Sequence, residues 1–120
     1  MRILHASFLV SDLDAAHEFY GKLLGLEVEE ERPELGFPGR WYGLESGQQI
    51  HLLMLPDPAR GKDLPEHGGR DRHVAFSVKD LDELSSRLDQ AKIPFTLSRS
   101  GRRALFCRDP DGNALEFVET

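Results

Sequence analysis

The sequence predicts an α+β fold in which two βαβββ modules pair to form a cup-shaped, partly open, barrel-like sheet of eight strands with the helices outside. Residues 5–14 (HASFLVSDLD) and 73–82 (HVAFSVKDLD) share six of ten residues, and each segment begins with a histidine. Each segment leads into a helical pattern and then into three short β-type runs. A four-stranded sheet with one helix leaves one face uncovered, so the two uncovered faces are expected to form a concavity.

The elements follow the same order in both copies. In the first helix, Gly25 occupies the position of a C-cap. In the second helix, Asp80 and Glu83 predict a start of the capping-box type. The apolar stripes are Ala16, Phe19, Tyr20, Leu23 and Leu24 in the first helix and Leu81, Leu84, Leu88 and Ala91 in the second. The expected strands after the helices are residues 26–30, 40–45 and 48–55 in the first copy and 93–98, 103–109 and 113–119 in the second.

The length of 120 residues fits a single domain. Within it we expect module one at 1–55, module two at 72–120, and a linker at 56–71 that contains three prolines and three glycines.

Composition excludes several classes of partner. The net charge of −6 argues against binding to nucleic acid or anionic membranes. No apolar run is long enough to cross a bilayer, and the N-terminus reads as a strand rather than a signal peptide. A single cysteine, Cys107, is compatible with a reducing cytoplasm, which is the expected location. It is expected to be a buried, inert thiol.

Alternation along the strands sorts the side chains by face. Phe8 and Val10 are expected to face the first helix, as are their counterparts Phe76 and Val78 in the second copy. The open face then receives His5, Ser7 and Leu9 from the first copy and His73 and Ser77 from the second.

The last strand of each copy adds one polar residue to the open face. Aligning the two copies on Gly47 and Gly112 places His51 opposite Glu116. A single histidine at a strand start is usually structural, but here four repeat-related positions all hold residues of ligating type. Three imidazoles and a carboxylate suit a transition metal, so we predict His5, His51, His73 and Glu116 as ligands. For His51 the sequence leaves open a second role, beside the metal or facing the substrate.

The repeated H-x-x-F-x-V-x-D-L-D segments, HEFYGKLLGLEV and the closing DPDGNALEFVE resemble the vicinal oxygen chelate superfamily over nearly the whole chain. The resemblance implies paired βαβββ modules around a divalent metal held at His5, His51, His73 and Glu116. It does not distinguish iron, nickel, zinc, manganese and cobalt, because related enzymes carry Glu or Gln at position 51. It also implies a homodimer, with sites that are often shared between subunits.

The resemblance implies an enzyme acting on a small oxygen-bearing molecule through a metal-stabilised enolate or alkoxide. Glu116 is the expected proton-transfer residue. Leu9 and Leu55 stand where glyoxalase I carries its glutathione anchors, which argues against that activity. Phe106 replaces the tyrosine of extradiol dioxygenases, which weakens that alternative. The other alternative is a metal-independent, bleomycin-resistance-like binding protein. The substrate cannot be read from the sequence.

Further residues are candidates for the substrate pocket or the chemistry. Trp41 and Phe106 are aromatic pocket candidates, and Arg103 is the candidate for holding an anionic group, although a solvated basic hairpin is the simpler interpretation. His67 in the linker is a weak acid–base candidate, and His17 is expected at the surface.

Overall fold

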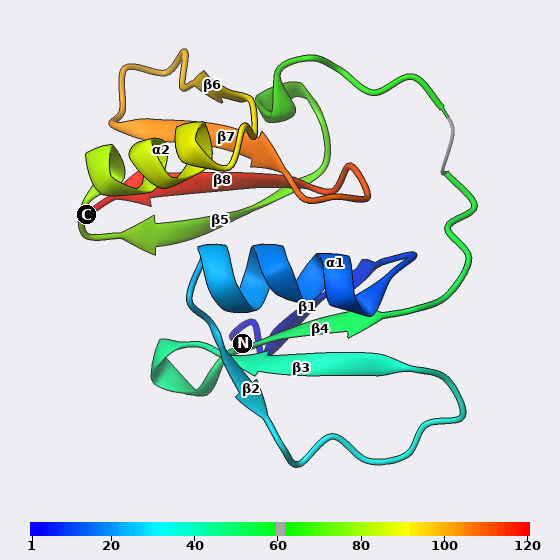
Figure 1. The fold of residues 1–120 in the computed structure, drawn as a ribbon. Coiled ribbons are helices and arrows are strands. Elements are labelled where there is room, and N and C mark those ends of the chain that lie inside the picture. The colour runs from blue at the N-terminus through cyan, green and yellow to red at the C-terminus, as the bar shows by residue number, and fades with distance from the viewer. Residues whose placement is uncertain (60–61) are drawn as a thin grey trace. The chain divides into compact units, whose positions relative to one another are not determined.

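The protein is described from a computed structural model covering residues 1–59 and 62–120, so residues 60–61 at the centre of the predicted linker lie outside the described part. The chain divides into two compact units, Met1–Arg60 and Gly61–Thr120. In Figure 1 the first runs from blue to green and the second from green to red. Within the described ranges, no helix combines the length and apolar character needed to cross a membrane.

Unit 1 contains a mixed four-stranded sheet with the strand order β1-β4-β3-β2. Its elements are β1 (His5–Leu9), α1 (Leu13–His17), the π-helix η1 (Glu18–Leu23), β2 (Glu27–Glu29), β3 (Gly39–Gly43), the short 3₁₀ turn η2 (Glu45–Gly47) and β4 (Gln49–Leu53). The first strand pairs in parallel with the last, and the others pair in antiparallel fashion.

Unit 2 repeats this topology with the strand order β5-β8-β7-β6. Its elements are the 3₁₀ turn η3 (Gly68–Arg70), β5 (His73–Val78), α2 (Leu81–Gln90), β6 (Phe95–Leu97), β7 (Ala104–Arg108) and β8 (Ala114–Glu119). The first and last strands are again parallel neighbours. Both units therefore have the predicted βαβββ order, although the strands are shorter than the sequence runs suggested.

In unit 1 the helical segment packs on the face of the sheet that carries Phe8 and Tyr42. The Tyr20 ring lies 6.0 Å from the Phe8 ring and 6.1 Å from the Tyr42 ring. Asp12 begins α1 by accepting hydrogen bonds from the backbone N–H groups of Asp14 and Ala15. The predicted single helix is in fact an α-helical turn continued as a π-helix, and it ends before Gly25, which has a φ of +76° as a C-terminal glycine requires.

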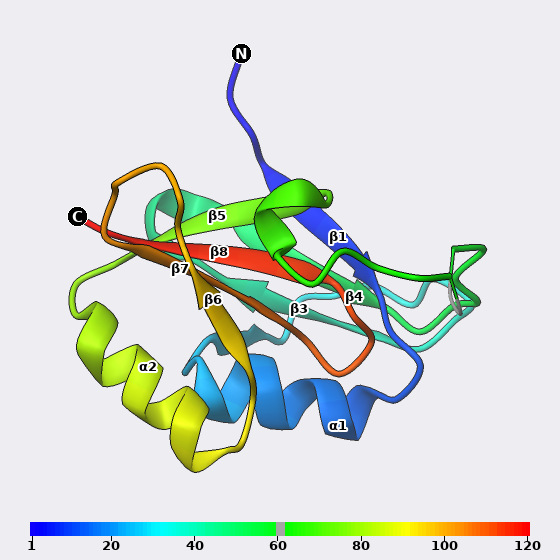
Figure 2. The same ribbon diagram turned by 90° about the horizontal axis from the view of Figure 1, so that it is seen from above.

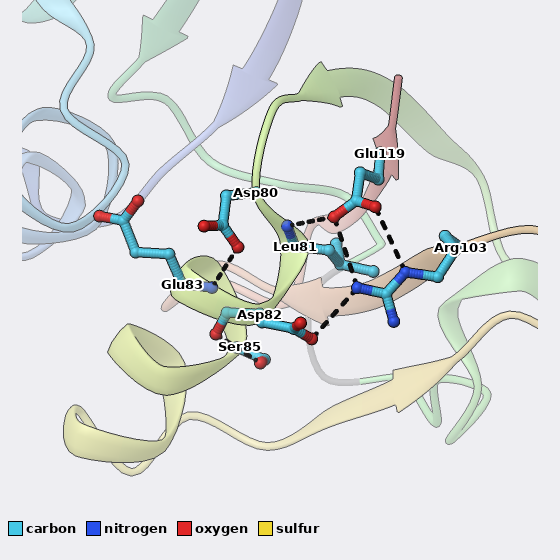
Figure 3. A network of polar contacts seen from close by, with 7 residues as sticks. All are labelled: Asp80, Leu81, Asp82, Glu83, Ser85, Arg103 and Glu119. Carbon is cyan, nitrogen blue, oxygen red and sulfur yellow. Dashed lines mark hydrogen bonds and ion pairs between the residues drawn. The ribbon is translucent and has the colours of Figure 1, made fainter.

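In unit 2 the helix α2 lies against one face of its sheet, as both views show (Figures 1 and 2). The Asp80 carboxylate accepts the backbone N–H of Glu83, which confirms the predicted helix start (Figure 3). Leu81, Leu84 and Leu88 are buried, whereas Ala91 at the C-cap is exposed and does not extend the stripe.

The strand β5 keeps the predicted alternation, since His73, Ala75 and Ser77 are more exposed than Val74, Phe76 and Val78. The Phe76 and Phe117 rings stack at 5.5 Å on the same side of the sheet. On that side, the Glu119 carboxylate accepts the N–H of Leu81 at the start of α2. Each sheet therefore has a helix-bearing face and a second face, which carries the predicted ligands.

Candidate functional site

In unit 1 the face away from the helix carries a row of side chains that crosses three strands. Ser7 of β1 pairs with His51 of β4, and His51 pairs with Trp41 of β3, so all three side chains leave the sheet on one side. His5 lies two residues before Ser7 and therefore on the same face. His51 is 9% exposed, and it is enclosed by the rings on either side of it.

These rings form a stack. The His5 and His51 ring centroids lie 4.0 Å apart with planes inclined by 12°, and the His51 and Trp41 centroids lie 4.0 Å apart with planes inclined by 3°. His51 Nε2 lies 2.9 Å from Gln49 Oε1, which fixes the orientation of the ring. Burial first, and then the charges of His5 and Arg32, lower the pKa of His51 to about 4. At pH 7 its imidazole is therefore neutral, as a metal ligand must be.

Unit 2 carries the corresponding row. Ala75 of β5 pairs with Glu116 of β8, which pairs with Phe106 of β7, which pairs with Thr96 of β6. Glu116 is 3% exposed and Phe106 is 7% exposed. The backbone register thus places a carboxylate and an aromatic ring side by side in the middle of the sheet.

The two rows correspond position by position. Glu116 takes the place of His51, as the alignment on the glycines predicted, and Phe106 takes the place of Trp41. The relation between the two aromatic residues was missed at the sequence level, although both lie on the strand antiparallel to the ligand-bearing one. Each unit thus places one aromatic ring next to its polar residue.

His73 is held by its backbone surroundings and directed at Glu116. Its Nδ1 lies 2.8 Å from the carbonyl oxygen of Asp71, and because a carbonyl only accepts, Nδ1 carries the proton and donates. Its Nε2 lies 3.3 Å from Glu116 Oε2. The Phe106 ring packs edge-on against the imidazole at 5.2 Å. A histidine anchored through one nitrogen to a carbonyl is the usual arrangement of a metal-binding imidazole.

The arginine that contacts Glu116 is Arg102 and not Arg103. Arg102 Nη2 donates to Glu116 Oε1 at 2.9 Å. Arg103 lies on the helix-bearing side, where it contacts Asp82 at 3.1 Å and Glu119 at 3.4 Å (Figure 3). Strand alternation explains the difference, because position 102 has the parity of positions 106 and 116, while position 103 has the opposite parity.

His67 lies in the loop before β5 and is buried, at 8% exposure. Its Nδ1 lies 2.6 Å from the Thr96 hydroxyl, and its ring packs edge-on against Phe106 at 4.8 Å. The adjacent Gly69 lies against the His67 ring, where a Cβ would collide. The predicted linker histidine is therefore part of the Phe106 side of unit 2.

His17, expected at the surface, is instead half-buried in unit 1. Its Nδ1 lies 2.8 Å from the Tyr42 hydroxyl, and the two rings stack at 5.9 Å. Gly21, one helical turn later, has no side chain where the His17 ring lies, and a Cβ there would collide with that ring. A glycine inside an otherwise apolar helical pattern was the sequence signal for this close approach.

The remaining candidates differ in how exposed they are. Ser7 and Ser77 are exposed on the ligand-bearing faces, and Leu9 and Leu55 are half-buried. Cys107 is buried, and its burial raises the pKa of the thiol to about 12, in line with the expected inert thiol.

A second arginine, Arg108 at the end of β7, holds the loop that precedes β5. Arg108 donates to Asp71 Oδ2 at 2.7 Å, to the carbonyl of Gly112 at 2.7 Å and to the carbonyl of Pro65 at 2.6 Å. Its hydrogen bond to Asp71 is the main cause that lowers the pKa of that carboxyl. Because the Asp71 carbonyl accepts from His73, Arg108 fixes the residue that orients the imidazole.

The two predicted ligand pairs differ in how well they suit a divalent ion. His73 Nε2 and Glu116 Oε2 lie 3.3 Å apart. Two ligands of one ion with bonds of about 2.1 Å are separated by about 3.0–3.4 Å. His5 and His51 lie face to face, so their nitrogen lone pairs lie in two nearly parallel planes about 4 Å apart and do not meet at one point. Across residues 1–59 and 62–120, no group of three or more His, Cys, Asp or Glu side chains is placed to hold an ion. The His73–Glu116 pair suits an ion as it is placed, whereas the His5–His51 pair requires a rotation of one ring.

Known proteins are similar in sequence to nearly the whole chain. A lactoylglutathione lyase of Escherichia coli O157:H7 is 32% identical over 130 residues, which cover 99% of this chain and 93% of that protein. The YaeR protein of Escherichia coli K12 is 29% identical over 98% of this chain and 95% of that protein.

Solved structures confirm the predicted fold. A glyoxalase family protein from Bacillus anthracis has a TM-score of 0.76 at 25% identity and covers 100% of this chain and 95% of its own. The trypanothione-dependent glyoxalase I of Leishmania major has a TM-score of 0.74 at 27% identity and covers 99% of this chain and 86% of its own. The sequence model of one family matches residues 2–117. The chain belongs to the Glyoxalase/Bleomycin resistance protein/Dioxygenase superfamily.

Proposed function

We propose that the protein is a divalent-metal-dependent enzyme that transfers a proton, or eliminates a group, on a small molecule with two neighbouring oxygens. The observation that carries this proposal is the pair formed by His73 Nε2 and Glu116 Oε2, 3.3 Å apart, with His73 anchored through Nδ1. A divalent ion bound there supplies Lewis-acid stabilisation of charge that develops on the substrate oxygens.

Glu116, Arg102 and Phe106 have separate proposed roles beside the ion. Glu116 is buried, so its carboxylate meets the substrate with little competing water; with Oε2 released from the ion, it would accept a proton from a carbon that bears one of the two oxygens. Arg102 holds Oε1 of the same carboxylate, which leaves Oε2 on the His73 side. Phe106 covers the His73 ring and keeps that side of the site apolar.

For unit 1 we propose that His5 completes the metal site. His51 is a further ligand if its ring turns out of the stack, and otherwise it supports His5. Metal contents of His5→Ala and His51→Ala separate these roles, because a supporting residue weakens metal binding without abolishing it.

The substrate is proposed to be smaller than a glutathione adduct. Leu9 and Leu55 offer no polar group at the positions of the glutathione anchors, although lactoylglutathione lyases are among the relatives. Phe106 lies beside His73 and Glu116 but has no hydroxyl, which argues against the extradiol alternative.

Metal analysis of the purified protein tests the proposal. We expect about one ion per chain in the wild type, lost in His73→Ala and strongly reduced in Glu116→Gln. Glu119→Gln is the matched control, because Glu119 lies three residues further along the same strand but on the helix-bearing side. Equal metal contents in Glu116→Gln and Glu119→Gln would refute the assigned role of Glu116.

One observation favours a second candidate function, a metal-independent binding protein. The stacked rings of His5, His51 and Trp41 present a flat aromatic surface whose nitrogens do not converge. A wild-type protein that binds no metal after reconstitution would support this candidate over the enzyme.

We also propose a homodimer in which His5 and His51 of one subunit act with His73 and Glu116 of the other. Mixing His5→Ala with Glu116→Gln subunits tests this, because each mixed dimer then contains one unaltered site and should recover metal binding. Mixed samples that bind no more metal than the separate variants would indicate sites built within one chain.

A further inference from the structure

We propose that Arg102 recognises an oxyanion of the substrate, either a carboxylate or a phosphoryl group, beside the oxygens that the metal site takes. The inference rests on the proposed function and specifies its substrate class. Uncharged diols and ketones would lack the group that Arg102 selects.

The position of Arg102 supports this role. Its guanidinium contacts Glu116, whose side chain is only 4% exposed, while 60% of its own side chain remains exposed. It therefore reaches from the surface to the buried carboxylate. Its other contact is a long one of 3.3 Å, from Nε to the Ser100 hydroxyl. The planar fork thus has donors left for a ligand.

The two oxygens of Glu116 serve different partners. Oε1 accepts from Arg102, and Oε2 faces His73. A ligand bound at the His73 side therefore lies next to the guanidinium without displacing it. The guanidinium adds a fixed positive charge and directional donors at this point, beside the charge that a divalent ion would bring, so it favours an anionic ligand over a neutral one.

The neighbouring arginines do not offer the same opportunity. Arg103 is paired with two carboxylates, Asp82 and Glu119, on the other side of the sheet. Arg108 donates to Asp71 and two backbone carbonyls, and its side chain is only 22% exposed. Among residues 1–59 and 62–120, Arg102 pairs with one carboxylate, that of Glu116, which belongs to the proposed site.

The test compares three ligands that share one hydroxy-carboxylate chelating pair. Glycolate has only that pair, tartronate adds a carboxylate, and 2-hydroxyphosphonoacetate adds a phosphonate. Calorimetric titration of the nickel-loaded protein measures the dissociation constant of each. We expect the wild type to prefer one or both of the larger ligands on the order of ten- to a hundredfold, as for a charge-assisted hydrogen bond. The stronger binder identifies the oxyanion.

Arg102→Met should remove that preference, and Arg103→Met, the matched control, should keep it. If Arg102→Met no longer holds nickel, the same titrations are made with Arg102→Lys, because lysine keeps the positive charge but lacks the paired donors of the guanidinium. If Arg102→Lys prefers the larger ligands less than the wild type does, the inference is supported; if its preference is unchanged, the inference is overturned.

Two further results overturn the inference in distinguishable ways. A nickel-loaded wild type that binds all three ligands equally refutes the role of Arg102 and leaves the proposed enzyme intact. A wild type that holds no metal refutes both.

Discussion

Arg108→Met gives the sharpest test of how the fold supports the site. The guanidinium makes three hydrogen bonds of 2.6–2.7 Å, to Asp71, Gly112 and Pro65, and is 22% exposed. Methionine keeps much of the aliphatic stem but none of the donors. Breaking a buried ion pair costs about 3–5 kcal/mol, and the partial exposure of both partners reduces this, so we expect a loss of about 2–4 kcal/mol in the free energy of unfolding.

Two measurements check this estimate. Urea unfolding of the metal-free protein gives the change in stability. Because the Asp71 carbonyl orients His73, a metal titration should show an affinity about tenfold or more below that of the wild type. Arg103→Met, which removes only exposed ion pairs, is the control and should change neither value appreciably.

The loss of stability caused by Arg108→Met should also depend on pH. The hydrogen bond from Arg108 lowers the pKa of Asp71, so the pair stabilises the fold above the unfolded pKa and loses that effect as pH falls through the lower folded value. The difference between variant and wild type should therefore shrink below about pH 4. A loss under about 1 kcal/mol at pH 7, with unchanged metal affinity, would refute the supporting role of Arg108.

Three further predictions concern unit 1 and the core. The pKa of His51 is lowered to about 4, so the unfolded chain binds the proton more readily than the folded protein does. The free energy of unfolding of the metal-free protein should therefore fall by about 1–3 kcal/mol as pH falls from about 6.5 toward 4. In urea unfolding, His51→Gln should show a smaller loss over that range. The single tryptophan, Trp41, stacks on His51, so nickel binding at His51 should quench its fluorescence; unchanged emission on saturation would place the metal elsewhere. Leu88→Ala, at a residue with no exposed surface, should lower the free energy of unfolding by about 2–5 kcal/mol, measured by urea unfolding, whereas Ala91→Gly, at the exposed C-cap, should cost much less.

The fold was predictable because the chain repeats itself. Two matching segments predict the order of elements, and alternation along each strand predicts the faces, so His73 and Glu116 are expected on one face, where their side chains lie 3.3 Å apart. The same alternation, counted back from Phe106, assigns Arg102 to the Glu116 face, whereas Arg103, the candidate chosen from the sequence, contacts Asp82 and Glu119 on the helix-bearing side.

Other features were beyond pattern reasoning. The contact of His67 with Thr96 joins an irregular loop to a strand, and no periodicity encodes such a contact. The π-helical segment from Glu18 to Leu23 is equally hidden, because apolar residues at α-helical spacing do not reveal where the hydrogen bonding shifts by one residue. The stacking of His51 between His5 and Trp41 depends on ring rotamers, which alternation does not determine.

The parallel pairing of the first and last strand in each unit has a consequence for the order in which the protein is made. The partner of β5 is β8, the final strand of the chain, so His73 is synthesised more than forty residues before Glu116 can join it. Closing so large a loop is entropically costly and slows folding. During translation unit 1 emerges before unit 2, and within unit 2 the strand that carries Glu116 emerges after β5, β6 and β7. A nascent chain is therefore unable to form the His73–Glu116 pair until β8 has been made, even when β5, β6 and β7 have already left the ribosome.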